Sequence, residues 1–196
     1  MSMKRGKYLV VLFICVGCWL LAGCGACRRE PVQEEFSRLT IFGARDTLLP
    51  GEMAMRTVAV AVHEISVPTA VALIEKVQLL ADSLSALRFN GLEIEVLEIT
   101  QASGYGRVLR VNLAEDAAFS GPGSLPPYQS WYDFFQGSAG GMETTITLRA
   151  TFLQPGIDLE WVEGVQFYYD GNPIREGDWD HLILHGIIKP QDTNSF

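Results

Sequence analysis

Apolar positions along the chain switch between a period of two and a helical period, which predicts an α+β fold. Residues 57–65 are rich in Val and Ala and predict a strand buried on both faces or nearly so. Residues 93–99 alternate glutamates with aliphatic side chains, and residues 107–113 form the partner strand of a predicted hairpin. Residues 39–42 are a candidate first strand. Between the strands, residues 70–87 have apolar side chains at helical spacing. These are Val71, Ile74, Val77, Leu80, Leu84 and Leu87.

The second half of the chain repeats the helix-then-strand order. Residues 144–153 have the spacing of a second helix, and residues 165–169 form a strand that ends in a tight turn at Asp170 and Gly171. Residues 181–188 are a last apolar strand candidate. The predicted order is strand, helix, strand, strand, helix, strand, in one α+β domain over residues 39–190 with the helices on one face of the sheet.

Residues 120–141 break this pattern. Glycines and prolines stand at both ends of the segment, and four aromatic residues lie between them: Trp131, Tyr132, Phe134 and Phe135. Aromatic side chains are enriched at interface hot spots, so an exposed loop would be a candidate partner contact. The alternative is a satellite core in which the loop folds back onto the sheet.

The N-terminus has the order of a secretory signal: basic residues, an apolar run over residues 8–21, and Leu21-Ala22-Gly23-Cys24. This order resembles a bacterial lipoprotein signal. The resemblance implies removal of residues 1–23 and acylation of Cys24, with residues 24–38 as a tether and residues 191–196 as a tail. Acyl chains on Cys24 would hold the mature protein on a membrane.

The alternative to a lipoprotein signal is a transmembrane anchor, but the apolar run is shorter than the roughly 20 residues that a spanning helix needs. We therefore expect a lipid-anchored protein on the extracytoplasmic side of the cell membrane. Gly25 follows Cys24 and favours the outer membrane if the bacterium has two membranes.

Charge and cysteine usage narrow the function classes. The chain has a formal net charge of −8, and residues 1–23 contain three basic and no acidic residues. The mature chain is therefore more acidic still, which disfavours nucleic acid as a partner. Cys27 is the only cysteine beyond Cys24, so a disulfide framework is not expected.

Three stretches between residues 57 and 175 resemble the GerMN domain of spore-germination and sporulation lipoproteins. They are the strand at residues 107–113, the helical segment at residues 148–152, and the strand and turn at residues 164–171. Asn112 stands where Asp is more usual in the family. The resemblance implies a ring-building type of fold, in which copies or relatives pack side by side. The matching motifs are structural, with Asp170 and Gly171 forming a turn, so the resemblance implies no catalytic residue and no cofactor.

Function therefore divides into three hypotheses. The first is a non-catalytic assembly module at the cell envelope, contacting other envelope proteins or itself. The second is a monomeric module that binds a peptide, glycan or other envelope ligand through the aromatic loop. The third is a metal-dependent hydrolase using His181 and His185, whose spacing matches no established zinc motif. The carboxylates of Glu93, Glu95 and Glu98 are interpreted as a solvated strand face.

Overall fold

The computed structural model describes residues 35–48, 51, 53–157 and 160–190. The described chain forms an α+β domain with helices packed on sheets. The predicted signal at 1–23, the acylation site Cys24 and the tail at 191–196 lie outside the described residues. No helix among the described residues has the length and apolar content needed to cross a membrane.

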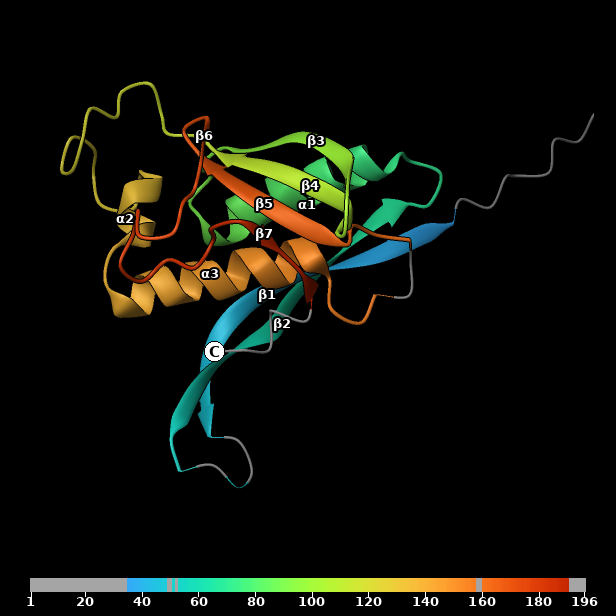
Figure 1. Cartoon of the computed structure of the whole chain (residues 1–196), viewed down its shortest axis with the longest axis horizontal. Helices are drawn as coiled ribbons and strands as arrows, with labels where there is room; N and C mark the ends of the chain where they lie inside the picture. The colour runs from blue at the N-terminus through green and yellow to red at the C-terminus, as the bar shows by residue number, and fades with distance from the viewer. Residues whose placement is uncertain (1–34, 49–50, 52, 158–159, 191–196) are drawn as a thin grey trace, which may run out of the picture. The chain divides into compact units, whose positions relative to one another are not determined.

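The first two strands form a long two-stranded ribbon (Figure 1). Strands β1 (Phe36–Leu48) and β2 (Met55–Pro68) pair antiparallel, with a bulge between Ile41 and Phe42. The first strand was expected at 39–42, and residues 36–38 were assigned to the tether. Both boundaries are wrong, because β1 begins at Phe36 and pairs with β2 along its whole length.

The remaining strands form a second, five-stranded sheet. Strands β3 (Ile94–Ala102) and β4 (Gly106–Leu113) form the predicted hairpin, and β5 (Gly164–Tyr169) pairs parallel with β4. The short strands β6 (Asn172–Pro173) and β7 (Ile187–Ile188) both pair antiparallel with β5. The last strand is therefore much shorter than the expected 181–188, and β2 lies in a different sheet from β3.

Two long helices pack against these sheets. Helix α1 (Leu73–Arg88) packs mainly on β3, and α3 (Ser138–Leu153) packs on β1, β2 and β5 (Figure 1). Helix α3 begins six residues earlier than the expected 144, inside the segment that the glycines marked as a loop. Glycine suits position 141 of this helix because the main chain at residue 181 packs against it, and a Cβ on Gly141 would lie 2.9 Å from the His181 carbonyl oxygen.

One apolar core joins the helices to both sheets. Helix α1 contributes Val77, Leu80 and Leu84, while β4 contributes Leu109 and Val111, and all five are fully buried. Ile74 and Leu87, which share the apolar helical spacing, are exposed. The buried stripe of α1 is thus narrower than its apolar sequence pattern.

Side chains from α1 and from the C-terminal end of α3 cover part of two strand edges. The Gln154 amide accepts from Thr40 N at 2.9 Å and donates to Thr40 O at 2.6 Å, and Thr151 Oγ1 accepts from Phe42 N at 3.0 Å. On β3, the Gln78 amide donates to Ile94 O and accepts from Val96 N. These bonds satisfy backbone groups that would otherwise be unpaired at a sheet edge.

Candidate functional site

Helix α2 (Trp131–Phe135) is fixed in place by hydrogen bonds at its N-terminus. The Glu115 carboxylate accepts from Trp131 N at 3.0 Å and from Tyr132 N at 2.9 Å, and Ser130 Oγ accepts from Asp133 N. These bonds pair backbone donors that a helix start leaves without an internal acceptor. Glu115 thus holds the aromatic segment against the body of the domain.

The same carboxylate also accepts a hydrogen bond from the Tyr169 hydroxyl at 2.8 Å. Burial of the phenol, reinforced by the hydrogen bond to Glu115 and by its charge, raises the pKa of Tyr169 well above its usual range. Tyr169 therefore stays a neutral hydrogen-bond donor at physiological pH, and it links β5 to the segment that begins α2.

The aromatic segment splits between the core and the surface. The side chains of Trp131 and Phe135 are almost completely buried, with Trp131 Nε1 donating to Glu93 O at 3.0 Å. Other aromatic rings pack against both side chains. The ring centroids of Phe89 and Trp131 lie 4.8 Å apart, and those of Trp179 and Phe135 lie 4.9 Å apart. The prediction that Trp131 and Phe135 contact a partner is therefore wrong, because both side chains lie in the core.

Tyr132 and Phe134 are half-buried and remain within reach of the surface. Phe134 packs edge-on against Phe89 at 5.2 Å and against Tyr128 at 5.3 Å between ring centroids. Of the four aromatic residues singled out from the sequence, these two are partly exposed, and contact with a partner through them stays a prediction.

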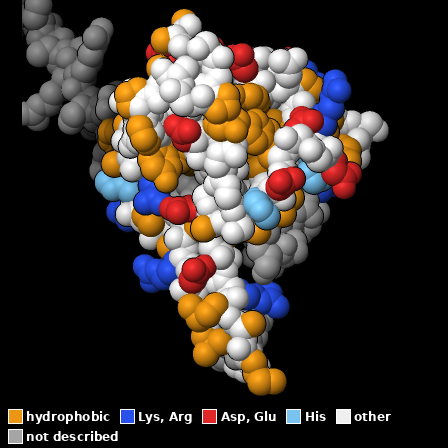
Figure 2. Space-filling model, turned by 90° about the vertical axis from the view of Figure 1, so that its left-hand side faces the viewer, with side chains coloured by type: hydrophobic (Ala, Val, Ile, Leu, Met, Phe, Trp, Pro, Cys, Tyr) orange, Lys and Arg blue, Asp and Glu red, His pale blue; other side chains and the backbone are white. Residues whose placement is uncertain are grey.

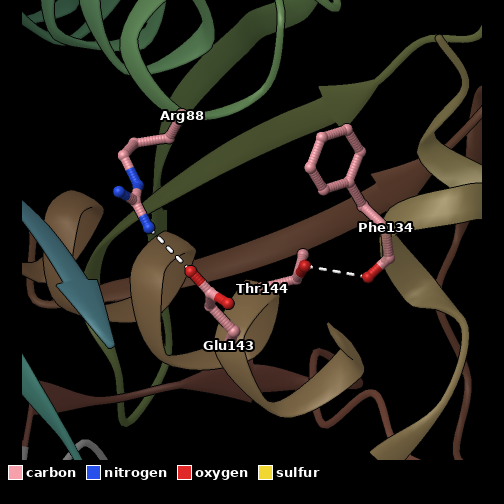
Figure 3. Close-up of polar contacts among 4 residues, drawn as sticks. All are labelled: Arg88, Phe134, Glu143 and Thr144. Atoms are coloured by element: carbon pink, nitrogen blue, oxygen red, sulfur yellow. Dashed lines mark hydrogen bonds and ion pairs between the residues drawn. The ribbon is translucent and has the colours of Figure 1, made fainter. Parts of the chain in front are cut away.

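A cavity of about 410 Å³ opens beside Phe134, between the end of α1 and the first turns of α3. Figure 3 shows Arg88 and Phe134 lying above α3, with Glu143 and Thr144 on the helix below them. Arg88 Nη2 lies 2.7 Å from Glu143 Oε1, and Thr144 Oγ1 donates to Phe134 O at 2.9 Å. The cavity therefore has an aromatic wall, an ion pair and hydroxyl groups, which together can bind a small molecule.

The second candidate surface is the free half of the ribbon, which is the part of β1 and β2 beyond the bulge at Phe42. Leu48, Met53 and Met55 at its end are exposed, and Val62 on β2 is exposed nearer the body. Figure 2 shows apolar side chains at the tip of a narrow projection, with basic side chains above them. The expectation that residues 57–65 are buried on both faces or nearly so is wrong, because residues 57–60 are half-buried and residues 61–64 are exposed.

The remaining sequence-based candidates have structural roles or stay untested. Asp170 and Gly171 both have positive φ and form the two-residue turn between β5 and β6, as predicted. Asn112 Oδ1 accepts from Gly171 N at 2.8 Å, while its amide donates to Glu95. Within the described part of the chain, no three His, Cys, Asp or Glu side chains gather as metal ligands around His181 or His185. The third glutamate of the β3 face, Glu98, pairs with Arg110.

Comparison of the chain with protein-family models, with curated proteins and with solved structures finds no match. The cavity beside Phe134 and the free half of the ribbon are the two candidate sites of the described chain.

Proposed function

We propose that this chain is a lipid-anchored, extracytoplasmic protein whose domain is a non-catalytic contact module of the cell envelope. The signal-like N-terminus ending at Cys24 supports the anchor, and the resemblance of residues 107–113 and 164–171 to GerMN domains supports an assembly role. Its partners are other envelope proteins or further copies of the chain.

The observation that carries this proposal is the exposure of apolar side chains along the outer half of the β1–β2 ribbon. Leu48 is 57 % exposed and Met55 is 62 % exposed, and Met53 is fully exposed between them. Single exposed apolar residues are ordinary on protein surfaces, but a projecting group of them indicates an interaction site. Burial of this tip by a partner would remove its apolar area from water.

The strand edges support the same surface. In the described chain β1 and β2 pair only with each other, and side chains from the C-terminal end of α3 bond the β1 backbone at Thr40 and Phe42. A two-stranded ribbon with free edges can add a strand from a neighbour. The ribbon therefore offers backbone as well as apolar contacts.

Crosslinking in intact cells tests this proposal. A photoreactive benzoylphenylalanine replaces Met53 in the full-length chain, and in a control variant it replaces Glu75, an exposed residue on α1. We expect defined adducts from position 53, either multiples of the chain mass or one heterologous product, and little from position 75. Equal diffuse labelling from both positions would contradict a contact at the ribbon tip.

The anchor has its own test. Replacing Cys24 by Ser in the full-length chain removes the thiol that would be acylated. We expect the wild-type chain in the membrane fraction, carrying a mass increment for the acyl groups, and the variant unacylated. A wild-type chain with an unmodified Cys24 and an intact N-terminus would overturn the lipoprotein assignment.

A further inference from the structure

The methionines outside the predicted signal are concentrated at the free end of the ribbon. The sequence has five methionines, and two of them, Met1 and Met3, lie in the predicted signal. Met142 lies on α3, whereas Met53 and Met55 lie two residues apart where the chain enters β2. Two of the three remaining methionines therefore lie on the surface that carries the proposed contact.

The thioether groups at the ribbon tip are open to solvent. Met53 is fully exposed and Met55 is exposed over more than half of its surface, whereas Met142 is half-buried. Figure 2 shows apolar side chains at the end of the projection, away from the body of the domain. Oxidation of a methionine to its sulfoxide depends on access of the oxidant to the sulfur. A soluble oxidant should therefore react with Met53 and Met55 before Met142.

Oxidation would change the chemistry of the tip and leave the core alone. Leu48 is the other large exposed apolar side chain described there, so the two methionines supply much of the apolar surface. A sulfoxide is polar, and burying it in a contact costs free energy unless the partner hydrogen-bonds it. Neither Met53 nor Met55 belongs to the described apolar core. The modified chain should therefore stay folded.

We propose that Met53 and Met55 are modification sites at which oxidation by a hydroperoxide releases the partner from the ribbon. The thioether sulfur attacks the terminal peroxide oxygen, and an S–O bond forms as the O–O bond breaks. The sulfur loses two electrons, and the departing oxygen takes the proton and leaves as water when the oxidant is hydrogen peroxide. This inference rests on the proposed contact role of the ribbon. A bound partner would cover both sulfurs, so the chain is oxidised while it is free.

Peptide mass spectrometry locates the oxidation without needing a partner. The full-length chain is diluted in detergent until it is monomeric and is then treated with hydrogen peroxide for increasing times. We expect Met53 and Met55 each to gain one oxygen atom well before Met142 does. Equal rates at all three methionines, or faster oxidation of Met142, would overturn the assignment of the modification to the tip.

Crosslinking measures the effect of oxidation on the contact. Benzoylphenylalanine replaces Leu48 in the wild-type chain and in a Met53→Leu, Met55→Leu variant, whose side chains stay apolar but contain no sulfur. Solubilised membranes are treated with hydrogen peroxide until both wild-type methionines are converted. We expect wild-type adducts to fall by about tenfold for each sulfoxide that the partner cannot hydrogen-bond, and the variant's adducts to remain. Methionine sulfoxide reductases with a dithiol should restore the wild-type adducts.

The outcomes separate this inference from the ribbon contact itself. Wild-type adducts that persist with both methionines converted would overturn the release by oxidation and leave the contact standing. Equal loss in the wild type and in the Met53→Leu, Met55→Leu variant would place the sensitive group elsewhere and overturn the proposal too. Absence of adducts before any peroxide is added would contradict the contact, and with it the release.

Discussion

The two halves of the β1–β2 ribbon have similar apolar sequences but opposite surroundings. Near the body, Leu39, Ile41 and Val67 are buried in the core that α1 and α3 share with the sheets. Beyond the bulge at Phe42, residues of the same kind such as Leu48 and Met55 face solvent. Packing against the helices and the second sheet, and not strand composition, therefore decides which part of the ribbon is core. The uncovered half is the surface that a partner would cover.

The largest difference in stability should come from truncating one side chain to alanine in each half of the ribbon. Leu39→Ala leaves a cavity in the core and should lower the free energy of unfolding by about 2–5 kcal/mol. Met55→Ala removes an exposed side chain and should change it by less than about 0.5 kcal/mol. Chemical denaturation of the full-length chain in detergent measures both. Similar losses for the two variants would show that the outer half is already packed within the single chain.

The next largest loss of stability should come from removing the Gln154 side chain, which bonds the β1 backbone on the inner half of the ribbon. Gln154→Ala removes both the acceptor for Thr40 N and the donor to Thr40 O, so it should cost about 1–3 kcal/mol. Gln78→Ala removes the equivalent bonds at β3 and serves as the control. Hydrogen exchange should accelerate at Thr40 in the first variant and at Val96 in the second. Protection of Thr40 that survives Gln154→Ala would mean that another group covers this edge.

The same Thr→Val substitution should change the free energy of unfolding in opposite directions at two threonines of α3. Thr151 accepts from Phe42 N, so Thr151→Val should lower the unfolding free energy by about 1–2 kcal/mol. Thr147 has an unpaired hydroxyl in the described structure, so Thr147→Val should raise it by about 1 kcal/mol. Thermal denaturation of both variants without ligand measures the difference. Equal destabilisation by the two variants would mean that Thr147 has a partner in the folded protein.

The smallest effect should come from the ion pair between Arg38 and Glu64 on the ribbon. The two side chains are 78 % and 60 % exposed and lie 3.9 Å apart. Glu64→Gln should therefore change stability by less than about 0.5 kcal/mol, and the change should vanish in high salt. A larger effect, resistant to salt, would place this pair in a buried interface and extend the contact surface toward the body.

Helix α1 and the β3–β4 hairpin were predictable because their apolar positions follow the spacing of a helix and of paired strands. Helix α3 has no such stripe, since every residue from Thr144 to Leu153 is buried. The pattern at 107–113 and the turn at Asp170 and Gly171 are local signals, and the structure has both. The start of α3 was not predictable, since Gly141 reads as a helix breaker unless the crossing chain at His181 is known. The same holds for β2, whose valines and alanines predict burial although residues 57–60 are only half-buried and residues 61–64 are exposed.

The candidate site was harder to predict than the fold. The aromatic residues at 131–135 are visible in the sequence, but only tertiary structure separates buried Trp131 from half-buried Phe134. Arg88 and Thr147 give no sequence signal, because an arginine in a last helical turn and a threonine in a helix are both ordinary. Both line the cavity only because α1 and α3 meet in the folded domain, and the exposed ribbon tip likewise follows from tertiary structure.

The most direct test of the account is the mass of the particles that contain the full-length chain after gentle extraction from its own membrane. Native mass spectrometry compares the wild type with a Leu48→Ser, Met53→Ser, Met55→Ser variant, whose changes lie at exposed positions and should leave the fold intact. If the ribbon is a contact surface, the wild type forms an assembly, with itself or with one defined protein, that the variant loses while keeping its melting temperature. A monomeric wild type, or an assembly unchanged in the variant, would contradict a contact role for the ribbon.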